Sequence, residues 1–159
     1  MDHRSLAALG ALIAAVGLAA CGMAPAAPAA SVAPVAAVRA ALAFSAVLSE
    51  GNELPPRPGQ GRGTLEASLD PASGQFTWTV VYAGLGGPVT AAHFHGPALP
   101  AQVAGVVLTM TGSLVNPIKG SAILTPSQAA ELSAGRWYVN LYTAAQPNGD
   151  VRGQVNLRP

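Results

Sequence analysis

The feature that most constrains the fold is a two-residue alternation of apolar and polar side chains, which begins near residue 41 and recurs to the C-terminus. In GTLEASLD, apolar Leu65, Ala67 and Leu69 alternate with polar residues, and after the turn PASG the stretch QFTWTVVY places Phe76 and Trp78 on one face. Successive side chains of a β-strand point to opposite faces, so this period predicts strands. We expect these two stretches to form a β-hairpin.

Similar stretches lie between turn signals rich in glycine and proline. Further strands are expected around 42–48, 89–96, 103–112, 118–123, 136–143 and 150–157. One short helix is expected at about 126–134, because Thr125 suits the N-cap, Pro126 the first turn, Gln128 a capping box and Gly135 the stop. The pattern predicts an all-β sandwich or barrel of about 7–8 antiparallel strands.

The last two strands allow a register to be predicted. Apolar and polar residues alternate along both strands. Their apolar residues therefore share a face only if the numbers of each two paired residues have an even sum. A six-residue loop AAQPNG then pairs the outward-facing residues as Tyr142 with Arg152, Asn140 with Gln154, and Tyr138 with Asn156. Asp150 lies two residues before Arg152, and we expect the two to form an ion pair on this face. The row is either a solvated sheet face or part of a site.

The N-terminus is typical of a processing signal. A short charged start, Met1–Arg4, precedes an apolar run that ends at Cys21, which predicts a signal peptide over 1–20. The run is shorter and richer in alanine than the roughly 20 strongly apolar residues of a membrane span. Its end, Leu18-Ala19-Ala20-Cys21, resembles the bacterial lipoprotein processing box, which implies a lipidated (palmitoylated) Cys21. The alternatives are an ordinary signal peptide or a membrane anchor.

The segment after Cys21 is rich in alanine and proline and is expected to be a tether, over 21–40, that carries a single domain over 41–159. No aspartate follows the cysteine to indicate inner-membrane retention, so by the same analogy we expect an outer-membrane anchor. Cys21 is the one cysteine of the chain, so the exported domain is held together by its core, without a disulfide.

Composition excludes several functions. Charged residues make up 9% of the chain and its net charge is +1, so no basic surface is expected to hold nucleic acid. Phosphate-binding glycine loops and the GxSxG motif are absent from the sequence. These counts favour a binding or structural protein.

The stretch AAHFHGPA offers the strongest candidate for chemistry. His93 and His95 are two residues apart, so on a strand they share a face and can supply half of a Zn²⁺ or Cu²⁺ site. The chain has three histidines, and His3 falls within the expected signal peptide. A metal would therefore need Tyr142, Asp150 or a neighbouring molecule. A histidine could instead act as a general base, but no serine or acid is visibly placed beside one, so we expect no enzyme and no cofactor.

Four stretches in order resemble the CHRD (chordin-type) domain: GTLEASLD with FTWTVVYAGL, VTAAHFHGPA, LTPSQAAELSAGRWYVNLYT, and PNGDVRGQV. The resemblance covers nearly all of 41–159 and implies an immunoglobulin-like β-sandwich or barrel with no established enzymatic activity. Such domains occur in the extracellular regulator chordin and in bacterial exported proteins. The site residues that match the family are His93, His95, Asn140, Asp150 and Arg152. Tyr142 departs from it, since the family usually has histidine there. An HxH pair on a β-sandwich is also found in Cu/Zn superoxide dismutase, which is an analogy of fold only.

We therefore expect a non-enzymatic, envelope-anchored binding or structural module with an unidentified protein or polysaccharide partner. The cluster of His93, His95, Asn140, Tyr142 and Arg152 is expected to be a hydrogen-bonded network, because buried polar groups need partners. The loop over 51–63 carries Glu53, Arg57 and Arg62 and follows Glu50. It is either an exposed connection or a place where a ligand is recognised.

Overall fold

The computed structural model describes residues 40–159. The expected signal peptide, Cys21 and most of the expected tether lie outside these residues. The described part is built from eight strands, one 3-10 helix and one α-helix: β1 Leu42–Ser49, η1 Glu50–Asn52, β2 Arg62–Leu69, β3 Gln75–Ala83, β4 Val89–His95, β5 Val106–Thr109, β6 Ile118–Ile123, α1 Pro126–Ser133, β7 Trp137–Thr143 and β8 Gln146–Leu157. Within this part no helix has the length and hydropathy to cross a membrane.

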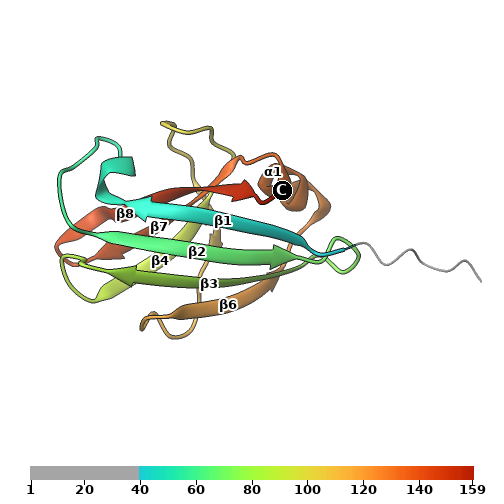
Figure 1. The fold of residues 1–159 in the computed structure, drawn as a ribbon, viewed down its shortest axis with the longest axis horizontal. Coiled ribbons are helices and arrows are strands. Elements are labelled where there is room, and N and C mark those ends of the chain that lie inside the picture. The colour runs from blue at the N-terminus through green and yellow to red at the C-terminus, as the bar shows by residue number, and fades with distance from the viewer. Residues whose placement is uncertain (1–39) are drawn as a thin grey trace, which may run out of the picture. The chain divides into compact units, whose positions relative to one another are not determined.

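The strands form one antiparallel sheet in the order β5-β4-β7-β8-β1-β2-β3-β6. The sheet curls around its apolar face into a half-barrel, with α1 at one end (Figure 1). The expected all-β fold with one short helix is confirmed, and the two strands of the hairpin, β2 and β3, pair from Arg62 with Ala83 to Leu69 with Phe76.

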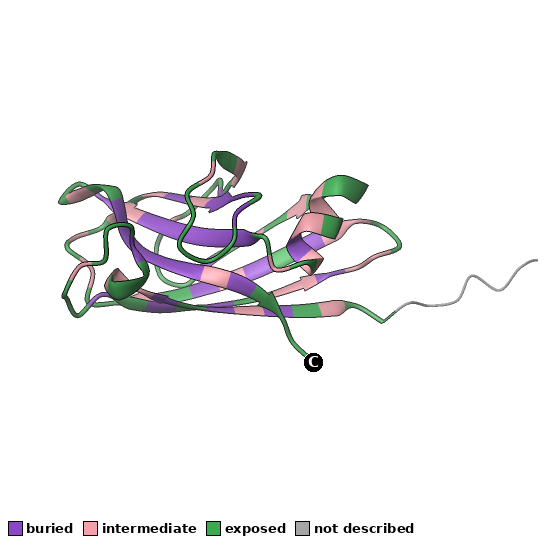
Figure 2. Cartoon of the chain, turned by 90° about the horizontal axis from the view of Figure 1, so that it is seen from above, coloured by how far each residue is buried: buried purple, intermediate pink, exposed green. Residues whose placement is uncertain are grey.

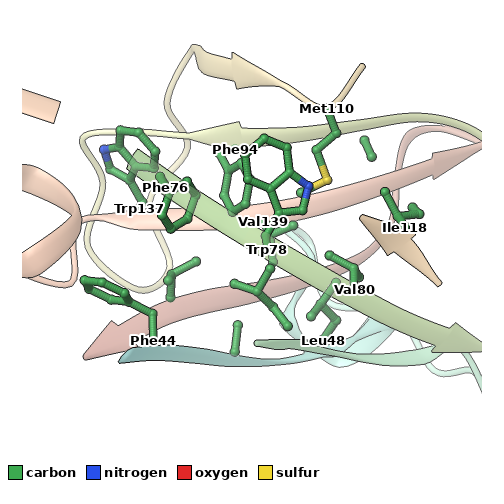
Figure 3. Packing of buried hydrophobic residues seen from close by; sticks show 14 of the residues in the cluster. Phe44, Leu48, Phe76, Trp78, Val80, Phe94, Met110, Ile118, Trp137 and Val139 are labelled. Carbon is green, nitrogen blue, oxygen red and sulfur yellow. The ribbon is translucent and has the colours of Figure 1, made fainter. Parts of the chain in front are cut away.

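The inner face of the half-barrel holds an aromatic core. Phe76 packs against Phe44, Trp78, Phe94 and Trp137, with ring centroids 5.4–6.4 Å apart, and Figure 3 shows these rings gathered between strands from both halves of the sheet. Each fully buried large side chain contributes about 1.5–3 kcal/mol relative to an exposed one. These contacts join β1 and β3 to β4 and β7, so the core holds the curl of the sheet.

The helix α1 begins and ends as the sequence predicts. Thr125 accepts a hydrogen bond from the backbone N–H of Gln128, the side chain of Gln128 accepts one in return, and Pro126 occupies the first turn. Gly135 has a positive φ of 68°, the conformation that glycine adopts readily after a helix. Leu132 is the buried residue of the helix and anchors it to the end of the core.

The predicted register of β7 and β8 is wrong by two residues. Asn140 pairs with Arg152 and Tyr138 with Gln154, whereas Thr143 pairs with Gln146. The six-residue loop does not form, because Ala144 and Ala145 alone make the turn and β8 begins at Gln146. The extra residues, which include Gly149 with a φ of 124°, form an irregularity within β8 instead. Parity is preserved, so the apolar residues still face the core.

The outer face of β4, β7 and β8 carries polar side chains, and two loops lie against it. Figure 2 shows buried residues along these central strands and exposed residues along the loops. One loop, here the 50–61 loop, joins β1 to β2, and the other, the 96–105 loop, joins β4 to β5. Their contacts with the face define the candidate site.

Candidate functional site

Three adjacent strands place the predicted residues on one surface. His93 on β4 lies beside Asn140 on β7, and Asn140 lies beside Arg152 on β8. His95 lies beside Tyr138 in the next row. The structure therefore brings together the histidines, the amide and the guanidinium that the sequence singles out.

His95 is fixed at both ring nitrogens. Its Nδ1 lies 3.0 Å from the carbonyl oxygen of Ala104, which can only accept, so Nδ1 carries the proton. Its Nε2 lies 2.8 Å from the hydroxyl of Tyr142, which donates to it in the neutral ring. Burial lowers the pKa of His95, which favours this neutral form. The proton on Nδ1 and the lone pair on Nε2 are thus both used in hydrogen bonds within the protein.

Tyr138 lies between two planar groups from the flanking strands. The ring of His95 stacks on it with centroids 4.8 Å apart and planes within 3°, and the guanidinium carbon of Arg152 lies 3.6 Å from its centroid. Since β4 and β8 flank β7, the three side chains form a stack across three strands. Such stacking and cation–π contacts contribute about 0.5–2 kcal/mol each and hold the groups rigid.

The stack also fastens the 96–105 loop. The hydroxyl of Tyr138 donates to the carbonyl of Ala104 and accepts from its N–H, both at 3.2 Å. Arg152 donates to the carbonyl of Gln102 at 2.6 Å, and Gln154 donates to that of Ala98 at 3.0 Å. The side chains of the sheet therefore satisfy the backbone of a loop that has no sheet partner over most of its length.

Tyr142 leans along β7 toward His95 and covers part of the face. Its ring lies edge-on to His93, with centroids 5.4 Å apart. Burial raises the pKa of Tyr142 to about 12, with neighbouring Tyr138 and Glu53 adding to the effect. The phenol is therefore a neutral hydrogen-bond donor at physiological pH.

Glu53, from the 50–61 loop, is buried against this face. The residue is 6% exposed, and its Oε2 accepts a long 3.5 Å bond from the amide of Asn140. Its Oε1 is buried without a hydrogen-bond partner. Burial raises the pKa of Glu53, while the charge of Arg57 opposes this effect. Gly149 makes room for the carboxylate, since a Cβ there would lie 2.8 Å from Oε2 of Glu53.

The expected ion pair between Asp150 and Arg152 does not form. The carboxylate of Asp150 accepts from the hydroxyl of Thr143 at 2.6 Å and from the N–H of Gly86 at 3.0 Å. The irregularity before Val151 turns Asp150 toward the end of β7, whereas Arg152 points to the 96–105 loop. Asp150 therefore belongs to a separate turn-stabilising group.

Sequence reasoning missed the role of the 50–61 loop. Arg57 donates to Gln146 and, at 2.9 Å, to the backbone carbonyl of Asp150. Asn52 donates to the carbonyl of Arg152 at 3.1 Å, and Glu50 accepts from the N–H of Gly61 at 2.7 Å. The loop is thus a folded cover rather than a free connection. Its one signal in the sequence is the set of charged and amide residues among prolines and glycines.

The predicted metal ligands do not converge. The rings of His93 and His95 are nearly perpendicular, at 89°, with centroids 5.9 Å apart. No group of three His, Cys, Asp or Glu side chains within 40–159 is arranged to hold a metal ion. Nδ1 of His93 is buried without a partner, but a metal on His95 would have to displace Tyr142 or Ala104. The arrangement fits hydrogen bonding better than coordination.

A family comparison agrees with this architecture. The family model described as "CHRD domain" matches residues 44–155, which is more than half of the chain. The chain belongs to the CHRD domain family. The match runs from β1 into β8, so both histidines, the covering loops and α1 lie inside the CHRD domain. No curated protein and no solved structure gives a significant match.

Proposed function

We propose that the chain is a non-enzymatic binding module, held at the cell envelope by a lipid on Cys21. The observation that carries the binding proposal is the pair of loops, 50–61 and 96–105, that the polar face of the sheet holds in place. Loops on a rigid scaffold are common recognition elements. Here buried residues such as Glu53 and Arg152 fix them before any partner arrives, so a partner meets a preorganised surface.

The contacts of His95, and the burial of Nδ1 of His93 away from solvent, support a structural role rather than catalysis. A general base needs a free nitrogen within reach of the proton that it takes. Nε2 of His95 instead accepts the hydroxyl of Tyr142, and Nδ1 is held by Ala104. The raised pKa of Tyr142, about 12, makes its phenol a poor nucleophile at neutral pH. The network therefore acts as the support of the loops.

Anchoring at the outer membrane rests on the sequence before residue 22. The charged start, the apolar run and Leu18-Ala19-Ala20-Cys21 are those expected of an exported lipoprotein. Labelled palmitate should be incorporated into the wild-type chain and not into Cys21→Ser. The wild-type chain should sediment with outer membranes, whereas the variant should be released into the soluble fraction. Sedimentation of an unlabelled chain with the inner membrane would contradict the anchor.

The binding role is tested by capture from crosslinked envelopes with the full-length lipidated protein. The partner is an envelope protein or polysaccharide, and nucleic acid is not expected because the chain carries a net charge of +1 and no basic surface. A specific partner that is lost when the loops are altered supports the proposal. Recovery of the same material with a variant whose 50–61 loop is shortened to a tight turn contradicts it.

A further inference from the structure

A cleft lies beside the histidine network rather than within it. It has a volume of about 460 Å³ and is formed by β1, β8, the start of the 50–61 loop and the tip of the 96–105 loop. This volume falls in the range of about 300–1,000 Å³ that is usual for ligand pockets. His93, His95 and Tyr142 are not among its lining residues, whereas Arg152 lies on its floor. The cleft is therefore a distinct feature that the network supports.

The cleft offers no free charge to a ligand. Its charged lining residues are Glu53 and Arg152, which are 6% and 3% exposed. Arg152 already donates to Gln102 and lies over Tyr138, and its charge acts on Glu53. An anionic or cationic ligand would gain little attraction here, so the cleft favours a neutral one.

The amide side chains at the cleft present fixed acceptors. Asn52 uses its amide nitrogen to donate to the carbonyls of Val47 and Arg152, at 3.2 and 3.1 Å. Asn156 uses its amide nitrogen on the carbonyl of Gln154, at 3.3 Å. Both residues are exposed, so their Oδ1 atoms remain available to accept from a ligand. Ser45 adds a hydroxyl that can donate or accept.

The walls of the cleft are small and apolar. Leu54, Pro56, Pro100 and Ala101 supply them, and each is exposed. A ligand that fits must therefore offer several hydroxyl or N–H donors along one edge and C–H surfaces along others. It must also carry no net charge. A pyranose ring combines these properties.

We propose that this cleft binds a neutral oligosaccharide, whose hydroxyls donate to Asn52 and Asn156 and whose C–H faces pack on the proline-lined walls. This inference rests on the proposed binding function and names the chemical class of its ligand. The cleft lining has no aromatic residue on which a sugar can stack, so binding is weak, with a Kd of about 0.1–1 mM for a short oligosaccharide.

Saturation-transfer NMR suits an affinity of this size. The full-length protein, in a detergent without a sugar head group, is mixed in turn with chitotetraose, cellotetraose and maltotetraose, and with a tetragalacturonate as the anionic control. Asn156→Ala removes one acceptor, and Ser45→Lys places a charged chain on the cleft floor. Asn148→Ala is the matched control, because Asn148 is also exposed but lies in the irregular start of β8, outside the cleft lining. Thermal unfolding checks that each variant folds.

Saturation transfer to at least one neutral tetrasaccharide is expected in the wild type and in Asn148→Ala. In the two cleft variants the saturation-transfer signal should be at least fivefold weaker. Equal signals in all four proteins, or a preference for the galacturonate, would overturn the inference. An envelope protein captured through the cleft, with no saccharide bound, would overturn it and leave the binding function standing. If neither a saccharide nor an envelope component binds, both proposals fail.

Discussion

Replacing His95 with Gln should destabilise the domain, whereas the same change at His93 should not. The two histidines are two residues apart on β4 but differ in their contacts. His95 is hydrogen-bonded to Tyr142 and Ala104 and stacked on Tyr138. Nδ1 of His93 is buried without a partner, and its ring contacts those of Tyr142 and His95 only edge-on.

The expected magnitude follows from the lost contacts. A glutamine can keep one of the two hydrogen bonds of His95, and the partner left unsatisfied costs about 1–3 kcal/mol. The lost stacking on Tyr138 adds about 0.5–1.5 kcal/mol. His95→Gln should therefore lower the free energy of unfolding by about 2–4 kcal/mol. For a domain of this size, with about 4 °C per kcal/mol, the Tm falls by roughly 8–16 °C. His93→Gln should change the free energy of unfolding by less than about 1 kcal/mol.

Urea unfolding at several pH values tests both the size and the cause. Burial lowers the pKa of folded His95 below its ordinary 6.5, so the unfolded chain takes up the proton first as the pH falls. Wild-type stability from this residue is therefore complete above pH 6.5 and declines below it. The difference between wild type and His95→Gln should narrow from pH 7.5 to pH 5.5. Equal, small effects of the two substitutions at pH 7.5 would refute the reasoning.

Three further predictions concern the same face. Gly149→Ala should cost about 2–5 kcal/mol in urea unfolding, because Gly149 has a φ of 124° and its Cβ would lie 2.6 Å from Nδ2 of Asn140 and within 2.9 Å of both carboxylate oxygens of Glu53. Gly112→Ala, at a φ of 92° with open space around it, should cost only about 1–2 kcal/mol. Glu53→Gln should raise the free energy of unfolding more at pH 8 than at pH 4, because burial raises the pKa of Glu53 above its ordinary 4.5 and penalises the folded anion at the higher pH; a gain that is larger at pH 4 would refute this. Titration calorimetry with Zn²⁺ or Cu²⁺ should give no Kd below about 10 μM, because both ring nitrogens of His95 are hydrogen-bonded within the protein. Tighter binding would support a metal site at His93 and His95 instead.

The local elements could be predicted from the sequence because their causes are local. The alternation around Leu65 and Trp78 places strands and their buried faces, and the capping residues around Pro126 place α1 within a residue of its observed end. The family could also be recognised, from ordered stretches that include His93 and His95. These features depend on neighbours in the sequence or on a pattern that the family shares.

The register of the last hairpin could not be predicted in the same way. The turn-forming residues in AAQPNG predict a loop of six residues, but the chain turns at Ala144 and Ala145 alone. Backbone pairing then continues through the turn-forming residues as an irregularity of β8. The position of the turn depends on how Asp150 and the covering loops pack. These contacts cannot be predicted from neighbouring residues in the sequence.

The site could be predicted in part. The family resemblance and the need of buried polar groups for partners predict a cluster that includes His93 and Asn140, and these two residues do lie side by side on β4 and β7. The cover formed by Glu53 and Arg57 could not be predicted, because the 50–61 loop contacts residues about 90 positions away in the sequence and carries no periodic pattern. Contacts of this kind depend on the whole curl of the sheet.

The polar face of β4, β7 and β8 holds the two covering loops in place through side chains such as those of Tyr138 and Arg152. Amide hydrogen exchange at Ala104 tests this directly, because its N–H donates to the hydroxyl of Tyr138 from within an irregular loop. The N–H of Ala104 should exchange slowly in the wild type and at least tenfold faster in Tyr138→Phe, while β2 remains protected in both. Fast exchange at Ala104 in the wild type, or no change in Tyr138→Phe, would contradict the account.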